Sequence, residues 1–160
     1  MPRAARPGPS ALAVLTVSRK HQDVDTSADA VVEELTSSQS WQLLRDAPVG
    51  RLAVVLGDGP EIFPVNHVVD HGSVVFRTGE GTKLRGAIGR AVAYEADGVD
   101  ATGRAWSVVV KGHAHEVLQL HELIDALDLP LFPWQAGLKP RFVRIVAEQV
   151  TGRRFVPRRR

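Results

Sequence analysis

The sequence predicts a mainly β fold of the α+β class: six antiparallel strands in a closed or partly closed barrel, with a few short helices. Six β-rich segments are separated by turn-forming residues. Only the connections after the third and fifth segments approach the dozen or more residues that a parallel crossover needs. The six segments are Arg51–Leu56, Ile62–Val69, Ser73–Thr78, Ala91–Ala96, Arg104–Val117 and Phe142–Val150.

The first three segments are joined by turns of hairpin length. Gly57–Pro60 and Asp70–Gly72 have the composition of tight turns, so these strands should form an antiparallel meander. Pro64 lies inside the second segment. Because proline cannot donate a ladder hydrogen bond, this stretch should be an edge, a bulge or a ligand-facing kink.

The fifth segment is unusually long, and Gly112 marks the point where such a strand would bend. Short helices are expected at three places. The first begins at a capping Ser38 or Ser40, buries Trp41 and Leu44, and ends before Pro48. The other two cover Thr82–Gly89 and His121–Leu127.

The organisation of the chain is that of one domain with two tails. Residues 1–36 are expected to be a mobile extension, with a short helical piece at Ala28–Leu35. Residues 37–155 should form the folded domain, and residues 156–160 a basic tail.

Composition excludes several classes of protein. The 160 residues contain no cysteine, which removes disulfides, thiolate metal sites and a cysteine nucleophile. No apolar run reaches the roughly 20 residues that span a bilayer, and no convincing secretory signal is present. A cytoplasmic protein without membrane contact is therefore expected.

The charge is unevenly distributed. The first 20 and last ten residues hold nine of the 20 basic residues and no acid, whereas residues 21–150 hold 11 basic and all 18 acidic residues, a formal charge of −7. A nucleic-acid-binding domain should be basic on its working face. No specific nucleic-acid partner is expected.

A short stretch, Phe76–Leu84, has the composition of a phosphate site. A strand ends, Gly79 and Gly81 allow a tight turn, and Thr82 and Lys83 open a helix close to Arg77. Backbone N–H groups, a hydroxyl and two cations suit a phosphate. The pattern is neither GxGxxG nor a P-loop, and on composition alone a turn with a capping threonine and a solvated lysine is the favoured interpretation.

The order of several such motifs resembles one known family. The motifs are Ala47–Ala53, Phe63–Asn66, the phosphate-like turn, Trp106–Gly112, Pro140–Ile145 and Val150–Phe155. Together they resemble the pyridoxamine 5′-phosphate oxidase-like family of flavin-binding split barrels, over roughly Ser38 to Phe155. The resemblance implies a six-stranded antiparallel split β-barrel that binds FMN, with the deazaflavin F420 as the alternative. It also implies a homodimer with two cofactor sites at the subunit interface and a small-molecule substrate.

The resemblance also assigns cofactor-binding residues. Pro64, Val65 and Asn66 would lie along the flavin ring system, where proline and valine cover its apolar face and strand backbone bonds its polar edge. The phosphate would be held by Arg77, Thr82 and Lys83, and Thr78 would lie between ring and phosphate. Trp106 and Ser107 would approach from the partner subunit.

The vitamin B6 oxidases of this family carry a C-terminal segment with Trp and Arg for their substrate. Phe132–Gln135 and the pair Arg153 and Arg154 do not reproduce that pattern, so oxidation of pyridoxamine phosphate is not implied. Trp134 would cover a ligand or fill the dimer interface.

The remaining candidates favour structural roles. His113 and His115 share one strand face, and His67 and His71 flank a turn, but no third ligand completes a metal site. Surface or interface histidines are the favoured interpretation. Ser107 has no evident His or Asp partner nearby in sequence for a hydrolase triad.

Three functions remain open. The first is a flavin-dependent oxidoreductase. No residue stands out as a general acid or base, and hydride transfer to or from a flavin does not require one. The second is a non-catalytic protein that binds or sequesters flavin, or an F420-dependent reductase on the same fold. The third is a dimeric scaffold that has lost its cofactor.

Overall fold

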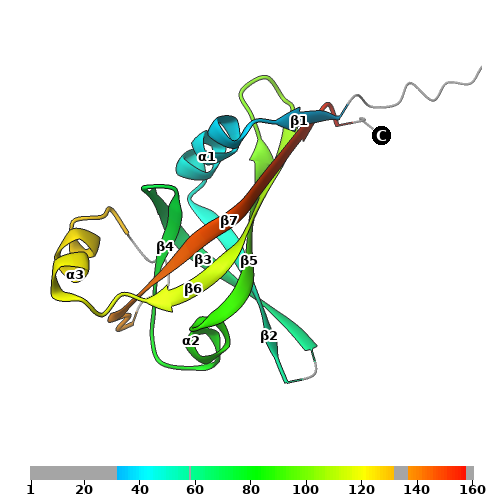
Figure 1. Cartoon of the computed structure of the whole chain (residues 1–160). Helices are drawn as coiled ribbons and strands as arrows, with labels where there is room; N and C mark the ends of the chain where they lie inside the picture. Colours follow the sequence, from blue (N-terminus) through cyan, green and yellow to red (C-terminus); the bar gives the residue numbers. More distant parts are fainter. Residues whose placement is uncertain (1–31, 58, 132–136, 158–160) are drawn as a thin grey trace, which may run out of the picture.

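A computed structural model of the chain describes residues 32–57, 59–131 and 137–157. These residues form a β-barrel with three short helices (Figure 1). The elements are β1 (Glu33–Leu35), α1 (Ser37–Asp46), β2 (Val49–Leu56), β3 (Gly59–Asp70), β4 (Ser73–Thr78), α2 (Thr82–Ala87), β5 (Arg90–Val99), β6 (Ala105–Glu116), α3 (Leu120–Leu127) and β7 (Arg141–Phe155).

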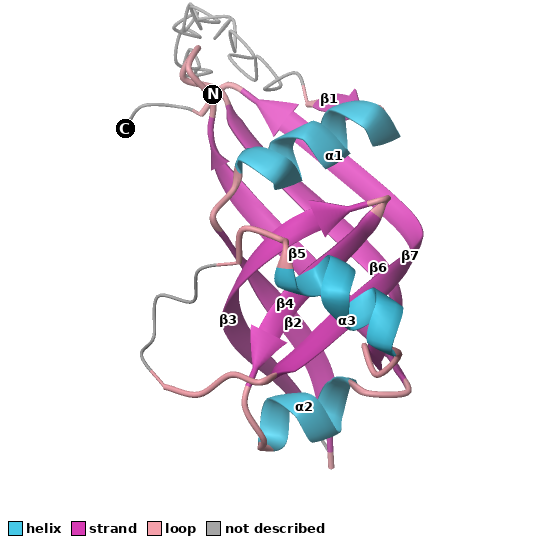
Figure 2. Cartoon of the chain, turned by 90° about the vertical axis from the view of Figure 1, so that its left-hand side faces the viewer, coloured by secondary structure: helices cyan, strands magenta, loops and turns pink. Residues whose placement is uncertain are grey.

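The strands close into a ring. Neighbours pair in the order β7-β4-β3-β2-β5-β6, and β6 pairs with β7 to complete the circle, every ladder being antiparallel. The predicted six-stranded antiparallel barrel and its meander of β2, β3 and β4 are confirmed. Figures 1 and 2 place α1 and α2 towards opposite ends of the barrel. No helix of the described residues is long and apolar enough to cross a membrane.

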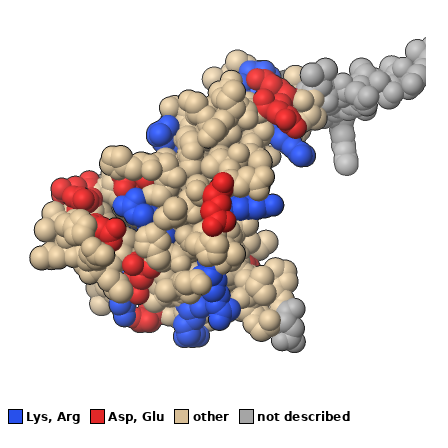
Figure 3. All heavy atoms as spheres, in the orientation of Figure 1, with Lys and Arg blue, Asp and Glu red and all other residues tan. Residues whose placement is uncertain are grey.

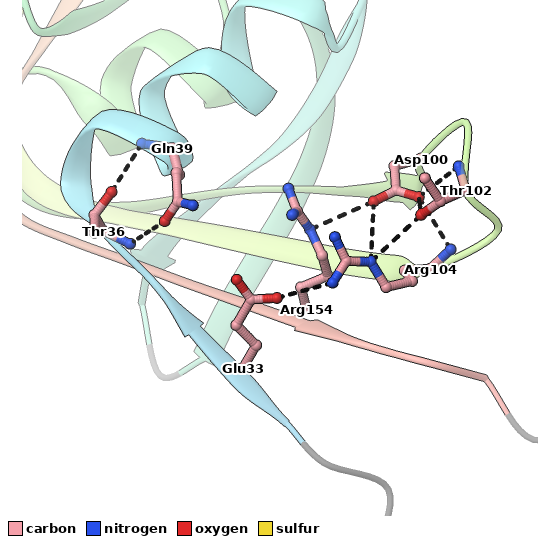
Figure 4. A network of polar contacts seen from close by, with 7 residues as sticks. All are labelled: Glu33, Thr36, Gln39, Asp100, Thr102, Arg104 and Arg154. Carbon is pink, nitrogen blue, oxygen red and sulfur yellow. Dashed lines mark hydrogen bonds and ion pairs between the residues drawn. The ribbon is translucent and has the colours of Figure 1, made fainter.

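A seventh strand, β1, replaces the helical piece expected at Ala28–Leu35. Glu33–Leu35 pair with Gly152–Arg154 on the far part of β7, whereas residues 28–31 lie outside the described ranges. Side-chain contacts hold β1 in place (Figure 4): Arg104 Nη1 donates to Glu33 Oε2 at 3.0 Å. The last residues of the predicted extension are therefore part of the barrel.

The cap of α1 also differs from the expected Ser38 or Ser40. Thr36 is the N-cap and forms a reciprocal capping box with Gln39, each side chain bonding the other residue's backbone N–H. Ser40 is buried and donates its hydroxyl to the Thr36 carbonyl at 2.9 Å. The helix ends before Pro48, as predicted.

The barrel interior is filled by alternate residues of the strands. In β6, Val108 and Val110 are fully buried, while Ser107 and Val109, which alternate with them, are partly exposed. Trp41 of α1 packs against this core. A second, smaller apolar cluster lies under α3 and consists of Val75, Val117, Ala126, Leu131 and Phe142.

The ladder between β6 and β7 is irregular at the glycine where the sequence predicts a bend. The register of β6 with β7 shifts between Lys111 and Gly112, which is the signature of a β-bulge. A Cβ atom on Gly112 would lie 1.9 Å from the carbonyl oxygen of Val146, so only glycine allows the two strands to approach this closely.

The barrel is split where β3 and β4 part. β3 pairs with β2 as far as Asn66, and with β4 only from His67 onward. Over residues 59–66, no described strand pairs with the second edge of β3. This confirms the edge position predicted for Pro64. Proline has no N–H to donate, and an edge that pairs with no strand does not need one.

Candidate functional site

The split between β3 and β4 brings the predicted phosphate-binding residues beside the free edge of β3. Arg77 lies near the end of β4, and Thr82 and Lys83 are the first two residues of α2. The Lys83 ammonium lies over the Phe63 ring of β3, with 5.5 Å between Nζ and the ring centroid. Residues from both sides of the split therefore meet around Lys83.

Lys83 carries a positive charge that the described chain does not neutralise. Its side chain is half-buried, and no carboxylate of the described residues pairs with it. Burial, together with the like charge of Lys139, lowers the pKa of the Lys83 ammonium. An anionic ligand would relieve both effects, which is the behaviour expected of a phosphate contact.

Arg77 is held in place beside the same turn. Its Nε donates to the Lys139 carbonyl at 3.0 Å, and its guanidinium lies 5.0 Å from the centroid of the Phe142 ring. Neither Nη nitrogen makes a hydrogen bond to a described residue. The side chain is thus oriented by its stem and its Nε, with its outer N–H groups left for another acceptor.

The nearby acidic residues are occupied by another cation. Glu80 lies within the turn, but it accepts from Arg141 Nε at 2.8 Å, and Arg141 Nη1 donates to Glu116 Oε1 at the same distance. The hydrogen bonds that Arg141 donates to these two carboxylates, the one to Glu80 first, raise the pKa of its guanidinium. This pairing keeps the Glu80 charge away from Lys83 and Arg77.

The threonines of the turn are not equivalent. Thr78 is 5% exposed, and its hydroxyl donates to the Gly79 carbonyl at 3.2 Å, so it supports the turn from inside. Thr82 is exposed, and the only described donor near its hydroxyl is Arg85 Nη2, at 3.5 Å. Thr82 is therefore the hydroxyl that a ligand can reach.

The helix itself is shorter than the predicted Thr82–Gly89. It ends at Ala87 because Ile88 is extended and forms a bridge with Ala114 of β6. Gly81, directly before it, has φ of +143°, a conformation that favours glycine. A six-residue helix has a small dipole, so side chains must supply most of the positive charge here.

Along β3, the three predicted ring contacts divide between two faces. Pro64 and Asn66 point outward, and the Asn66 amide donates to the Pro48 carbonyl at 3.1 Å. Val65 between them is 6% exposed and belongs to the core. Strand alternation turns the Val65 side chain into the barrel, away from the predicted ring position. Only its backbone can face a ligand.

Trp106 and Ser107 lie at the other end of β6 from the phosphate turn. Glu116, which contacts Arg141 beside that turn, is ten residues further along the strand, roughly 30 Å at the usual rise per residue. The Trp106 indole is 8% exposed and lies across Gly98 in its own core, while Ser107 faces outward opposite Asp97 and Arg153. One chain does not bring these two residues to the split.

An open hollow surrounds the exposed edge of Trp106. It has two lobes of about 430 and 540 Å³, which share Arg51, Asp97, Gly98, Val99 and Trp106. Arg51 Nη1 donates to Glu95 at 3.0 Å and also contacts Asp97. The carboxylates thus fix this arginine on the outer face, directly opposite Pro64 in the β2–β3 register.

His67 corrects the expectation of surface histidines. It is 6% exposed, its Nε2 lies 2.9 Å from the Leu44 carbonyl, and its Nδ1 lies 2.7 Å from the Tyr94 hydroxyl. The exposed His113 does fit that expectation and pairs with Glu148 at 2.8 Å.

Within the described ranges no three His, Asp or Glu side chains gather as a metal site. Trp134 lies outside those ranges.

The burial of His67 predicts a pH-dependent stability. Burial lowers the pKa of its imidazole below the ordinary 6.5, although the hydrogen bond to Leu44 opposes this. Below pH 6.5 the unfolded chain therefore binds more protons than the folded one, so stability falls as the pH falls, by at most about 1.4 kcal/mol per unit. Urea unfolding between pH 5 and 7.5 should show this slope in the wild type and in the exposed-residue control His71→Gln. It should be missing in His67→Gln.

Sequence reasoning missed three residues that shape the site. Phe63 lies under Lys83, Phe142 lies under Arg77, and Lys139 contributes a carbonyl to Arg77 and a charge near Lys83. Phe142 and Lys139 are about 60 residues away from the turn in sequence, so no local pattern reveals them. Figure 3 shows Lys and Arg side chains in the region of α2, and Arg85 of this helix is exposed.

Comparison with known proteins agrees with this geometry. A family model for pyridoxamine 5′-phosphate oxidase matches residues 36–154. An uncharacterized protein of Mycobacterium tuberculosis is 38% identical over 132 residues, which is 78% of this chain and 86% of that protein.

Two solved structures are similar in both sequence and fold. The FAD binding protein from Mycobacterium smegmatis is 37% identical with a TM-score of 0.69, over 80% of this chain and 100% of that chain. A protein from Corynebacterium glutamicum, provisionally named a pyridoxamine 5′-phosphate oxidase, is 41% identical with a TM-score of 0.71, over 79% and 99%. These likenesses confirm the split barrel and the resemblance from which the site residues were assigned.

Proposed function

The chain belongs to the pyridoxamine 5′-phosphate oxidase family, and we propose that it is a flavin-dependent oxidoreductase that binds FMN in the split between β3 and β4. The observation that carries the proposal is the cationic pair at this split. Lys83 is half-buried without a carboxylate partner among the described residues, and Arg77 is oriented with both Nη nitrogens free of described acceptors. Both suit a phosphate.

The residues present fit such a cofactor. Lys83, Arg77 and the Thr82 hydroxyl would hold the phosphate, and the free edge of β3 offers backbone groups to the polar edge of a planar ring. Pro64, which faces outward, would lie against its apolar face. A bound flavin would supply the two-electron chemistry, while the chain binds it, orients it and limits its contact with water.

A dinucleotide flavin is the second candidate. The relative from Mycobacterium smegmatis is an FAD binding protein by name. Arg85, whose Nη2 lies 3.5 Å from the Thr82 hydroxyl, adds a further exposed positive charge beside the turn. F420, which is also anionic, is a third ligand to compare. Measured affinities for FMN, FAD and F420 decide among the three.

The substrate is proposed to be a small molecule other than pyridoxamine phosphate. Of the residues that could mimic the substrate-binding segment of vitamin B6 oxidases, Arg154 is engaged by an ion pair, with 3.4 Å between its Nε and Asp100 Oδ2. Phe132–Gln135 lie outside the described ranges. A protein that only stores or carries flavin remains the non-enzymatic alternative, and turnover with an electron donor separates the two.

Purification without added cofactor tests the proposal. The protein should carry visible flavin absorption, or should bind one of the three cofactors stoichiometrically when titrated, and bound flavin should be reduced by a nicotinamide donor or a substrate. A colourless protein that binds none of the three would contradict the assignment and leave the dimeric scaffold as the function.

A second subunit is proposed to complete each site. In one chain Trp106 and Ser107 lie far from the phosphate turn, so a homodimer is needed if they are to reach the cofactor. Sedimentation should give twice the 17.4 kDa chain mass. Ser107→Trp, at an outward position, should weaken both dimerisation and flavin binding, while the same change at exposed Gln42 should not. A monomer that binds FMN stoichiometrically would contradict the shared site.

A further inference from the structure

A buried hydrogen-bonded chain lies at the point where the split of the barrel begins. Asn66 is the last residue of β3 that pairs with β2, and His67 is the first that pairs with β4. The backbone at this junction therefore determines the direction in which the free edge of β3 leaves the ladder. Pro64 and Val65 lie on the same edge, next to this junction.

The His67 imidazole connects this junction to two other elements. Its Nε2–H donates to the Leu44 carbonyl, 2.9 Å away in α1, and its Nδ1 accepts from the Tyr94 hydroxyl of β5 at 2.7 Å. A carbonyl can only accept, so Nε2 carries a proton, and in the neutral ring Nδ1 then accepts the Tyr94 hydroxyl proton. The two aromatic rings also meet edge to face, with 5.0 Å between their centroids.

The pocket around Tyr94 is made by a glycine. A Cβ atom on Gly50 of β2 would lie 2.1 Å from the Tyr94 hydroxyl oxygen and 2.6 Å from the Glu95 carbonyl. Gly50 lies directly opposite Val65 in the β2–β3 register. A side chain at position 50 of β2 would therefore block the Tyr94 hydroxyl from reaching His67.

The surroundings keep this chain uncharged. Phe76 is opposite His67 on β4, Leu44 contributes a backbone carbonyl from α1, and Tyr94 faces the imidazole from β5. No charged side chain of the described residues shifts the pKa of His67, which burial lowers. Burial also raises the pKa of Tyr94; the charge of Glu95 raises it further, and that of Arg51 lowers it by less.

We propose that His67, held between Leu44 and Tyr94, is a positioning residue that fixes the free edge of β3 where it meets the flavin ring. The inference rests on the proposed function. A proton added to Nδ1 would reverse this bond, so that the ring donates to the Tyr94 oxygen and the hydroxyl proton loses its acceptor, and it would place a positive charge in the buried junction. Flavin affinity should then fall in acid, through the placement of residues 64–66 rather than through direct contact.

Three variants separate positioning from general stability. Glutamine can donate to the Leu44 carbonyl and accept from the Tyr94 hydroxyl, but it does not titrate, so His67→Gln should keep wild-type affinity at pH 7.5. His67→Leu loses both bonds and should bind FMN roughly tenfold more weakly at that pH. Tyr94→Phe keeps the ring, loses one bond and should fall between them. His71→Gln is the matched exposed control.

The pH profile of FMN affinity gives the decisive readout. The FMN phosphate itself titrates near pH 6, so each variant is compared with wild type, and riboflavin is titrated in parallel. Between pH 7.5 and 5.5, wild type and His71→Gln should lose riboflavin affinity, whereas His67→Gln should not. Circular dichroism reports folding at each pH, and Tyr94→Phe remains informative if His67→Leu does not fold.

The possible failures are distinct. If wild type binds flavin but all variants share its affinity and pH profile, His67 is only a core residue and the inference is wrong. If wild type binds no flavin at any pH, the proposed function fails and the inference fails with it.

Discussion

Replacing Gly112 with alanine should lower the free energy of unfolding by about 3 kcal/mol, or roughly 6–12 °C in Tm. The added Cβ would lie 1.9 Å from the Val146 carbonyl oxygen, 2.9 Å from its carbon and 3.1 Å from the Ala147 Cα. All three are backbone atoms of β7, so no side chain can rotate away. The strands must separate at the bulge, where β6 and β7 close the ring.

Gly59→Ala is the matched control for this experiment. Gly59 also lies in a strand, but no heavy atom would come within 4 Å of its added Cβ. Thermal unfolding followed by circular dichroism should therefore leave this variant within about 0.5 kcal/mol of wild type, as for ordinary surface changes. Equal melting temperatures for the Gly112 and Gly59 variants would show that β7 moves freely at the bulge.

The parts of the fold that sequence predicts are those that depend on neighbouring residues. Asp70–Gly72 joins β3 to β4, and the register of β6 with β7 shifts at the glycine in the middle of β6. In contrast, β1 has only three residues, and its partner Gly152–Arg154 lies more than 100 residues away. Nothing in Glu33–Leu35 alone indicates that Arg104 will hold it.

The candidate site divides in the same way. Arg77, Thr82 and Lys83 can be recognised because strand, turn and helix follow one another directly in the chain. The orientation of Val65 depends on register, and a shift of one residue exchanges the inner and outer faces of a strand. The burial of His67 depends on Tyr94, 27 residues later, and therefore on how β3 and β5 are brought together.

Removing both phosphate-site cations should have the largest effect on function. Arg77→Ala combined with Lys83→Ala removes two charge-assisted contacts, each worth about 1.5–3 kcal/mol, so FMN affinity should fall by about 100-fold or more. Neither side chain is paired with a carboxylate of the described residues, so their removal leaves no carboxylate without its ion-pair partner. The fold should survive, and circular dichroism checks this.

Riboflavin, which lacks the phosphate, makes this prediction specific. If the two cations bind the phosphate, the double variant should retain most of its riboflavin affinity while it loses FMN. Arg45→Ala with Lys111→Ala removes the same net charge from exposed positions on α1 and β6 and controls for general electrostatic attraction. Equal losses of FMN affinity in the two double variants would indicate long-range attraction. If the Arg77 and Lys83 double variant retains its FMN affinity, the phosphate binds elsewhere, and the assignment of the cofactor site to the split is wrong.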